Sequence, residues 1–88
     1  MPVATIRAAR NRLHMERYLL VAQLRECEQH IARKTEIVAH QRQSVAEMEA
    51  NHARSLSIAK QLLATFEKML ADSQVERRSL RQQLDEAA

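Results

Sequence analysis

Four histidines, one cysteine and eleven carboxylates are the residues of this chain that could hold a metal ion. Cys27 and His30 are three residues apart, a spacing that places both side chains on one face of a helix. Glu49 and His52 form one Glu-x-x-His step, the unit of helical di-iron sites. Such sites need two steps and further carboxylates, and a zinc site needs three or four converging ligands. The sequence offers no such set, so we expect neither a metal nor any other cofactor.

Nucleophilic side chains are present, but nothing in the sequence arranges them for catalysis. Ser44, Ser55 and Ser57 occupy positions typical of a helix surface or a helix cap. A phosphate-binding loop needs glycine, and the chain has none. Cys27 falls at an apolar heptad position, which favours a small buried hydrophobe over a redox-active or cross-linking thiol, because reactivity requires exposure and a lowered pKa. We therefore expect a protein that is not an enzyme.

Three arginines near the N-terminus, Arg7, Arg10 and Arg17, lie close to one stripe of a helix and could bind anions. The formal net charge of the chain is only +3, and aromatic residues make up 2% of it. Binding of single-stranded nucleic acid usually combines positive charge with aromatic stacking. Binding to nucleic acid or to an anionic surface is therefore the alternative interpretation, not the favoured one.

The elements that would position these side chains are long helices. Ala, Arg, Gln, Glu and Leu are abundant, and the only proline is Pro2, so no residue after it forces the chain out of a helix. Between residues 20 and 48, apolar residues recur in alternating steps of three and four, the a/d pattern of a coiled coil. One heptad series is Leu24, Ile31, Val38 and Val45, and the other is Leu20, Cys27, Lys34, Gln41 and Met48. Such a stripe needs a second helix to cover it.

Two polar residues, Lys34 and Gln41, interrupt this stripe at consecutive positions of one series. Buried polar residues at such positions often fix the register or oligomeric state of a coiled coil. Lys34 can equally keep its stem in the interface and extend its amine to the solvent. The sequence leaves both interpretations open.

The heptad phase changes across residues 51–56. Downstream, Leu56, Leu63, Leu70, Arg77 and Leu84 form one series, and Ala59, Phe66, Ser73, Leu80 and Ala87 form the other. Such a change is typical either of a turn between antiparallel helices or of a stutter in one continuous helix. Asn51 tolerates the left-handed conformation that ends many helices, and Ser55 or Ser57 can cap the next one. We favour the turn, with helices over about 4–50 and 56–85 and a connection over about 51–55.

Three segments of the chain form a recognisable pattern: His30-Ile-Ala-Arg-Lys-Thr-Glu-Ile-Val38, Lys60-Gln-Leu-Leu-Ala-Thr-Phe-Glu-Lys68 and Arg77-Arg-Ser-Leu-Arg81. This pattern resembles a group of short helical bacterial proteins that are common in rhizobia and their relatives. The resemblance covers roughly residues 20–85 and implies two helices joined by a polar turn. The relatives usually have a glycine in that turn, whereas this chain has Asn51-His-Ala-Arg-Ser55. The group has no known activity, so the resemblance implies none.

These observations together predict a single all-α domain over residues 1–88, an antiparallel two-helix hairpin that pairs into a four-helix homodimer. The alternative is one continuous helix in a coiled-coil dimer. We expect a cytoplasmic adaptor, assembly factor or chaperone-like protein without a membrane span, which binds itself and another protein. The expected core of self-association is Leu20, Leu24, Ile31, Val38, Val45, Leu63, Phe66 and Leu70. The expected surface for an outside partner is Ile6, Leu13 and Tyr18.

Overall fold

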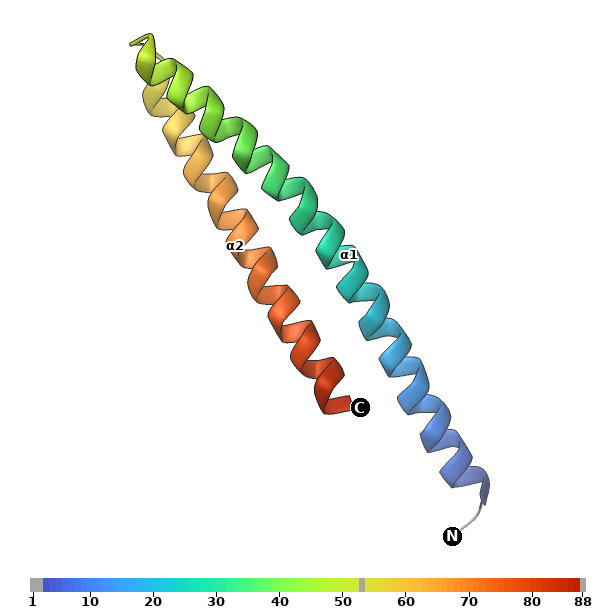
Figure 1. Cartoon of the computed structure of the whole chain (residues 1–88). Coiled ribbons are helices and arrows are strands. Elements are labelled where there is room, and N and C mark those ends of the chain that lie inside the picture. Colours follow the sequence, from blue (N-terminus) through green and yellow to red (C-terminus); the bar gives the residue numbers. More distant parts are fainter. Residues whose placement is uncertain (1–2, 53, 88) are drawn as a thin grey trace.

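The computed structural model of the chain contains two helices, α1 (Val3–Ala50) and α2 (Leu56–Ala87), which lie side by side in antiparallel directions (Figure 1). It describes the backbone of residues 3–52 and 54–87 and the side chains of residues 10, 12, 14–52 and 54–87. The expected antiparallel hairpin is therefore confirmed, and the continuous helix is wrong. Pairing of hairpins into a four-helix dimer stays a prediction.

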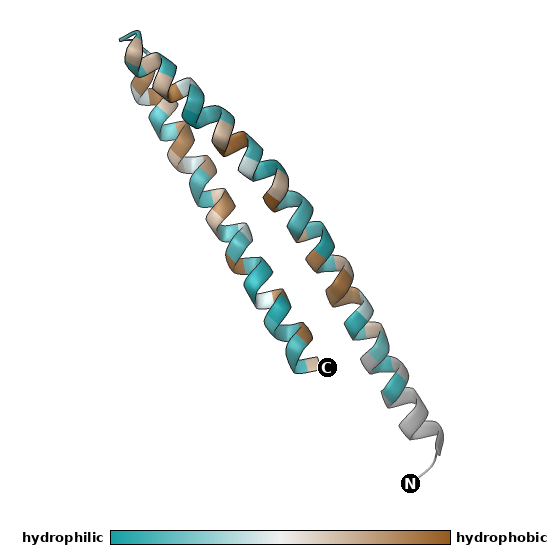
Figure 2. Ribbon diagram, viewed as in Figure 1, coloured by the Kyte–Doolittle hydropathy of each residue, from teal (hydrophilic) through white to brown (hydrophobic). Residues whose placement is uncertain are grey.

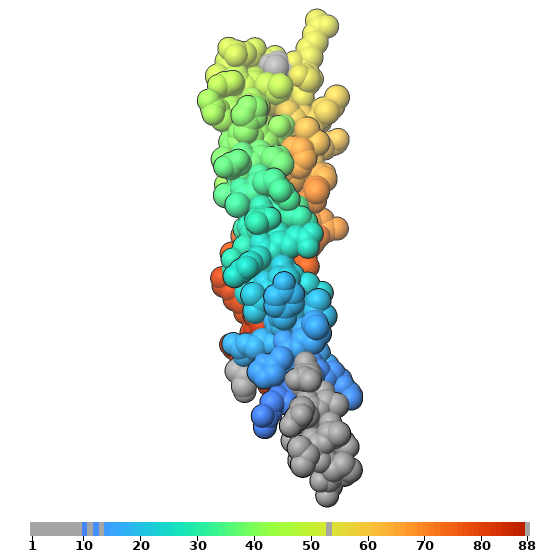
Figure 3. Space-filling model, turned by 90° about the vertical axis from the view of Figure 1, so that its right-hand side faces the viewer, coloured from blue at the N-terminus to red at the C-terminus, as the bar shows by residue number. Residues whose placement is uncertain are grey.

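The hairpin is long and thin, with extents of 74 × 15 × 14 Å along its principal axes. Figure 3 shows α2 on one side of α1 near the turn and on the other side near the C-terminal end of α2, so the helices wind around each other. Because α1 has 48 residues and α2 has 32, the first part of α1 extends beyond the end of α2 (Figure 1). We call residues 10–19 of this extension the overhang.

The two helices meet along the heptad stripes that the sequence predicted. The buried apolar residues of this contact recur at heptad spacing along both helices, and half-buried leucines fill the positions between them. Figure 2 shows hydrophobic residues on the side of each helix that faces the other. The buried apolar residues are Cys27, Ile31, Val38, Val45, Ala59 and Leu80. This stripe, which we call the seam, is narrow because each helix has only one neighbour to pack against.

The connection between the helices is short, and among its described residues one has a left-handed backbone. The amide of Asn51 still donates to the carbonyl of Glu47 at 3.1 Å, which continues the helical pattern, whereas His52 has a φ of 50°. The sequence suggested Asn51 for the left-handed position, and this was wrong, because α1 continues its hydrogen bonding one residue further. Ser55 precedes α2, and its carbonyl accepts the first helical hydrogen bond, from the amide of Ala59 at 3.0 Å.

Replacing His52 with glycine should stabilise the hairpin. A residue with a Cβ is penalised at positive φ and glycine is not, so we expect His52→Gly to raise the free energy of unfolding by about 0.5–1 kcal/mol after the entropy of glycine in the unfolded chain is counted. Urea denaturation followed by circular dichroism measures the change. Asn51→Gly is the matched control and should be neutral or destabilising. Greater stabilisation by Asn51→Gly than by His52→Gly would contradict the assignment.

Candidate functional site

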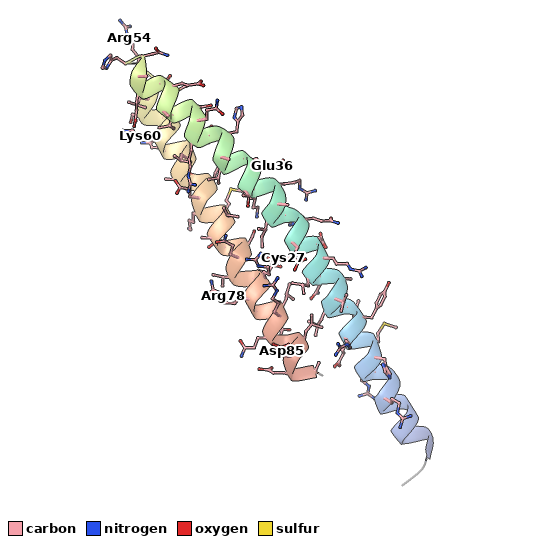
Figure 4. All side chains as sticks on the ribbon, in the orientation of Figure 1. Cys27, Glu36, Arg54, Lys60, Arg78 and Asp85 are labelled. Atoms are coloured by element: carbon pink, nitrogen blue, oxygen red, sulfur yellow. The ribbon has the colours of Figure 1, made fainter. Side chains whose placement is uncertain are left out.

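A small polar cluster lies inside the seam, where Ser73 of α2 contacts two residues of α1. The Cys27 thiol donates a hydrogen bond to the backbone carbonyl of Ser73 at 3.3 Å. The Lys34 amine donates one to the Ser73 hydroxyl. Ser73 is 5% exposed and Cys27 is 3% exposed, while Lys34 is half-buried (Figure 4, where Cys27 points between the helices). Burial raises the pKa of the Cys27 thiol, and the nearby Glu76 carboxylate adds to that effect.

The second polar interruption of the seam is also matched. The Gln41 side-chain amide donates to the backbone carbonyl of Ala59 at 3.2 Å. Among the described residues, no buried side-chain nitrogen or oxygen lacks a hydrogen-bond partner. Lys34 thus contacts Ser73 and Gln41 contacts Ala59 on α2. These contacts favour one axial register of the two helices. Of the two interpretations that the sequence left open, the contacts favour register fixing, although Lys34 remains half-exposed.

The two long sides of the hairpin, on either side of the seam, differ in character. On one side, three ion pairs join α1 to α2, each with 3.2 Å between nitrogen and oxygen. They recur at one heptad position of each helix. The pairs are Arg42 with Glu67, Lys60 with Glu49, and Arg81 with Glu28. We call this the charged side. Exposed pairs of this kind contribute at most about 1 kcal/mol each, so their effect is mainly to cover this edge of the seam with charge.

The opposite side, which we call the groove side, has apolar residues where the charged side has ion pairs. A groove of about 380 Å³ lies between the helices here, with Ile37, Phe66 and Met69 as its apolar lining. Ile37 is 44% exposed and Met69 is 45% exposed. Leu62, one heptad from Met69, is 44% exposed, and Ile58 continues the same stripe of α2 toward the turn. The groove also has a basic lining, made up of His30, Arg33 and Lys34 of α1.

A second apolar surface begins on the overhang and continues into the next turn of α1. Met15, Tyr18, Leu19 and Ala22 follow the i, i+3, i+4, i+7 pattern of one helix face, which we call the outer stripe. The exposed fractions are 59% for Met15, 70% for Tyr18 and 52% for Leu19. The neighbouring Leu20 instead packs against the buried cluster of Cys27, Ile31 and Leu80. The outer stripe therefore lies on the face of α1 that points away from the seam.

The residues expected to form the core of self-association all lie in the seam within one hairpin. Ile31, Val38 and Val45 are buried there, and the other five are half-buried. The structure brings them together inside one chain, and any contact they make with a second copy stays a prediction. Among the partner-surface residues, Tyr18 is exposed, and the side chains of Ile6 and Leu13 lie outside the described residues. Arg10 and Arg17 are exposed on the overhang, and the side chain of Arg7 lies outside the described residues.

The residues considered as metal ligands are spread along the hairpin. Cys27 is engaged with Ser73, and His30 lies 3.9 Å from the Glu26 carboxylate on its own helix. Glu49 pairs with Lys60 across the charged side, and His52 lies in the turn. In the part of the chain that the structure describes, no group of three or more His, Cys, Asp or Glu side chains could hold a metal ion.

Sequence reasoning missed most of the groove side and part of the outer stripe. Ile37 was absent from the predicted sites because it lies next to, not in, the heptad series of α1. Met15 was also absent, although Tyr18, three residues further along the same face, was among the predicted residues. The available signal was the i, i+3, i+4, i+7 spacing of a second apolar stripe, which becomes informative once the place of α2 is known.

The chain was compared with known proteins by family, by sequence and by fold. No family model matches it, and neither a curated protein nor a solved structure matches it. The resemblance to short rhizobial proteins therefore stays an expectation from the residues alone. Among the described residues, neither helix contains a stretch long and apolar enough to cross a membrane.

The Cys27 thiol should react slowly with a disulfide reagent at mildly alkaline pH. Burial limits access, and the raised pKa leaves less thiolate, so we expect the folded chain to react about 100-fold more slowly than the urea-unfolded chain. Because burial raises the pKa of the folded thiol, the stability that the neutral thiol contributes is lost as the pH rises from the ordinary pKa of a cysteine through the raised pKa of the folded state. The exposed control is Gln29→Cys in a Cys27→Ala background, which should react quickly folded or unfolded. Equal rates for folded and unfolded Cys27 would contradict its burial.

Replacing Lys34 with methionine should stabilise the hairpin. The half-buried Lys34 amine loses part of its hydration on folding and gains only one hydrogen bond in return. Methionine fills a similar volume and has no charge to desolvate. We expect Lys34→Met to raise the free energy of unfolding by about 1 kcal/mol, with Ser73 turning its hydroxyl to its own helix. Lys68→Met, at an exposed position, is the matched control and should change stability by less than about 0.5 kcal/mol. A loss of stability for Lys34→Met alone would mean that the hydrogen bond outweighs desolvation.

Proposed function

We propose that this protein is a non-enzymatic, self-associating helical adaptor of the cytoplasm, which offers the outer stripe of its overhang to a partner protein. The observation that carries the proposal is the exposure of Met15, Tyr18 and Leu19 on the face of α1 that points away from the seam. Four apolar residues at i, i+3, i+4 and i+7 are the pattern by which an amphipathic helix enters an apolar groove of another protein. The partner is therefore expected to present such a groove.

The composition of the outer stripe also supports binding. Tyrosine is enriched among the residues that dominate binding energy at protein interfaces, because its ring buries a large area at a low entropic cost. Tyr18 is the only tyrosine of the chain, and it is the most exposed of the large hydrophobic residues described. The seam supports this role by holding the first turns of α1 in helical form before a partner arrives, which lowers the cost of binding.

Binding of an anionic partner through the overhang is the alternative function, and one observation favours it. Arg10, Arg12 and Arg17 are exposed on the overhang, with Glu16 as the acidic side chain among them. Affinity for nucleic acid would fall steeply as salt is added, because binding releases counterions. Binding through the outer stripe would depend on Tyr18 and Leu19 and only weakly on salt.

Photo-crosslinking in the living host cell tests the proposal directly. A photoreactive phenylalanine analogue in place of Tyr18 should give a discrete crosslinked protein, and the same analogue in place of Gln29 should not. Gln29 is an exposed polar position of α1 further along the helix and serves as the matched control. Adding Leu19→Glu to the Tyr18 probe should remove the product, because it places a charge in the apolar contact.

The crosslinked species must be identified by mass spectrometry before the result is interpreted. One protein partner whose product is lost with Leu19→Glu supports the adaptor. A product that survives Leu19→Glu but is lost when Arg10, Arg12 and Arg17 are changed to glutamine overturns the adaptor in favour of an anionic partner. Equal products from the Tyr18 and Gln29 positions, or none from either, also overturn it. Circular dichroism should show unchanged helicity for every variant, since the altered side chains are exposed.

A further inference from the structure

We propose that a second copy of this chain covers the groove side, with both turns at the same end, so that α2 of each copy packs against α1 of the other. This inference rests on the self-association in the proposed function and names its surface and orientation. The product is a four-helix bundle with a two-fold axis along the hairpin.

The hairpin alone buries too little to be a stable domain. Only six described hydrophobic residues are buried, and even Val38, the most buried, is 2% exposed. A two-helix hairpin covers only one face of each helix, so even its long seam forms a thin core. Association with another helical surface is the usual remedy.

The two sides of the seam present different surfaces to a second copy, one covered by ion pairs and the other apolar. The charged side already pairs three arginines or lysines with three glutamates, so packing there would desolvate satisfied charges. The groove side exposes Ile37, Leu62 and Met69 at the g-type positions that line the second interface of helical bundles. Covering the groove side therefore removes apolar surface from water at the lower electrostatic cost.

Charge complementarity selects a second copy, and it also selects the orientation. Ser73 contacts both Cys27 and Lys34, which places the Asp72 region at the height of residues 27–34 of α1. Arg33 lines the groove at this height, and Asp72 lies three residues beyond Met69 on α2. Both are exposed, and neither forms an ion pair among the described residues.

With the two turns at the same end, α2 of the second copy lies over α1 at equal height. Asp72 of the second copy then faces Arg33, and Met69 of the second copy faces Ile37, and the two-fold axis repeats both contacts. With the turns at opposite ends, α1 faces α1 about a centre near Ile37, and Arg33 faces the region of Gln41, where the neighbouring charge is Arg42 and no carboxylate of the described residues lies on the groove side. The aligned orientation alone matches both the apolar and the charged parts of the groove side.

Sedimentation velocity of the full chain and its variants tests the surface. The wild type should have twice the chain mass of 10.2 kDa at micromolar concentration. Met69→Glu should be monomeric, and its helicity should persist because Met69 is 45% exposed. Arg33→Asp should weaken the dimer about tenfold, and Arg33→Asp with Asp72→Arg should restore it. Arg78→Asp, on the outer side of α2 (Figure 4), is the matched control and should leave the mass unchanged.

Disulfide trapping in a Cys27→Ala background tests the orientation. A mixture of Arg33→Cys chains with Asp72→Cys chains should form mixed disulfide dimers on mild oxidation. Ile37→Cys chains alone would crosslink efficiently only if the turns lie at opposite ends. Predominant crosslinking through Ile37→Cys would therefore overturn the orientation.

The remaining outcomes separate this inference from the proposed function. A dimer that survives Met69→Glu and the Arg33→Asp change would overturn the groove side as the interface, while self-association would stand. A monomeric wild type would overturn both self-association and this inference. The Tyr18 crosslink to a partner would be unaffected, because it depends on the outer stripe.

Discussion

The packing of α1 against α2 along one narrow seam is the interaction on which the other features of this structure depend. Each helix has a single neighbour, so the contacts between distant described parts of the chain lie in this stripe of apolar residues or directly beside it. The seam is also what separates the charged side from the groove side, because both are defined by the heptad positions next to it. A helix that rotated about its own axis would turn one of these sides into the contact and the seam residues toward the solvent, so the seam determines which residues stay exposed.

The polar residues in the seam determine the height at which the helices meet. Leucine and valine contacts tolerate sliding by one heptad, because the apolar stripe repeats itself every seven residues. The hydrogen bond from Lys34 to the Ser73 hydroxyl does not repeat, because Ser73 is the one serine of its heptad series, so it distinguishes the observed alignment from its neighbours. The same alignment brings the three ion pairs of the charged side into range. Polar residues at the Lys34 and Gln41 positions therefore reduce apolar burial slightly but select one axial register of the two helices.

The sequence predicted the hairpin because the heptad phase changes where the chain turns, and the structure confirms that interpretation. It could not predict which turn residue takes the left-handed conformation, since this depends on how far the hydrogen bonds of α1 continue. It could not predict the ion pairs or the groove, because both require the relative height of the helices as well as their faces. Ile37 illustrates the difference, since its exposure follows from the position of Phe66 and Met69 on α2.

The unequal length of the helices has a thermodynamic consequence. The overhang has no neighbouring helix, and an isolated helix of fewer than about 12–15 residues is only marginally stable in water. Its helical form is therefore propagated from the part of α1 that α2 holds, and local opening of the seam shortens the nucleus from which it extends. A substitution at Leu24 or Leu80 in the seam would change the population of helix at Tyr18, although neither residue belongs to the outer stripe. Through this coupling, the stability of the seam sets the fraction of molecules in which the overhang is helical.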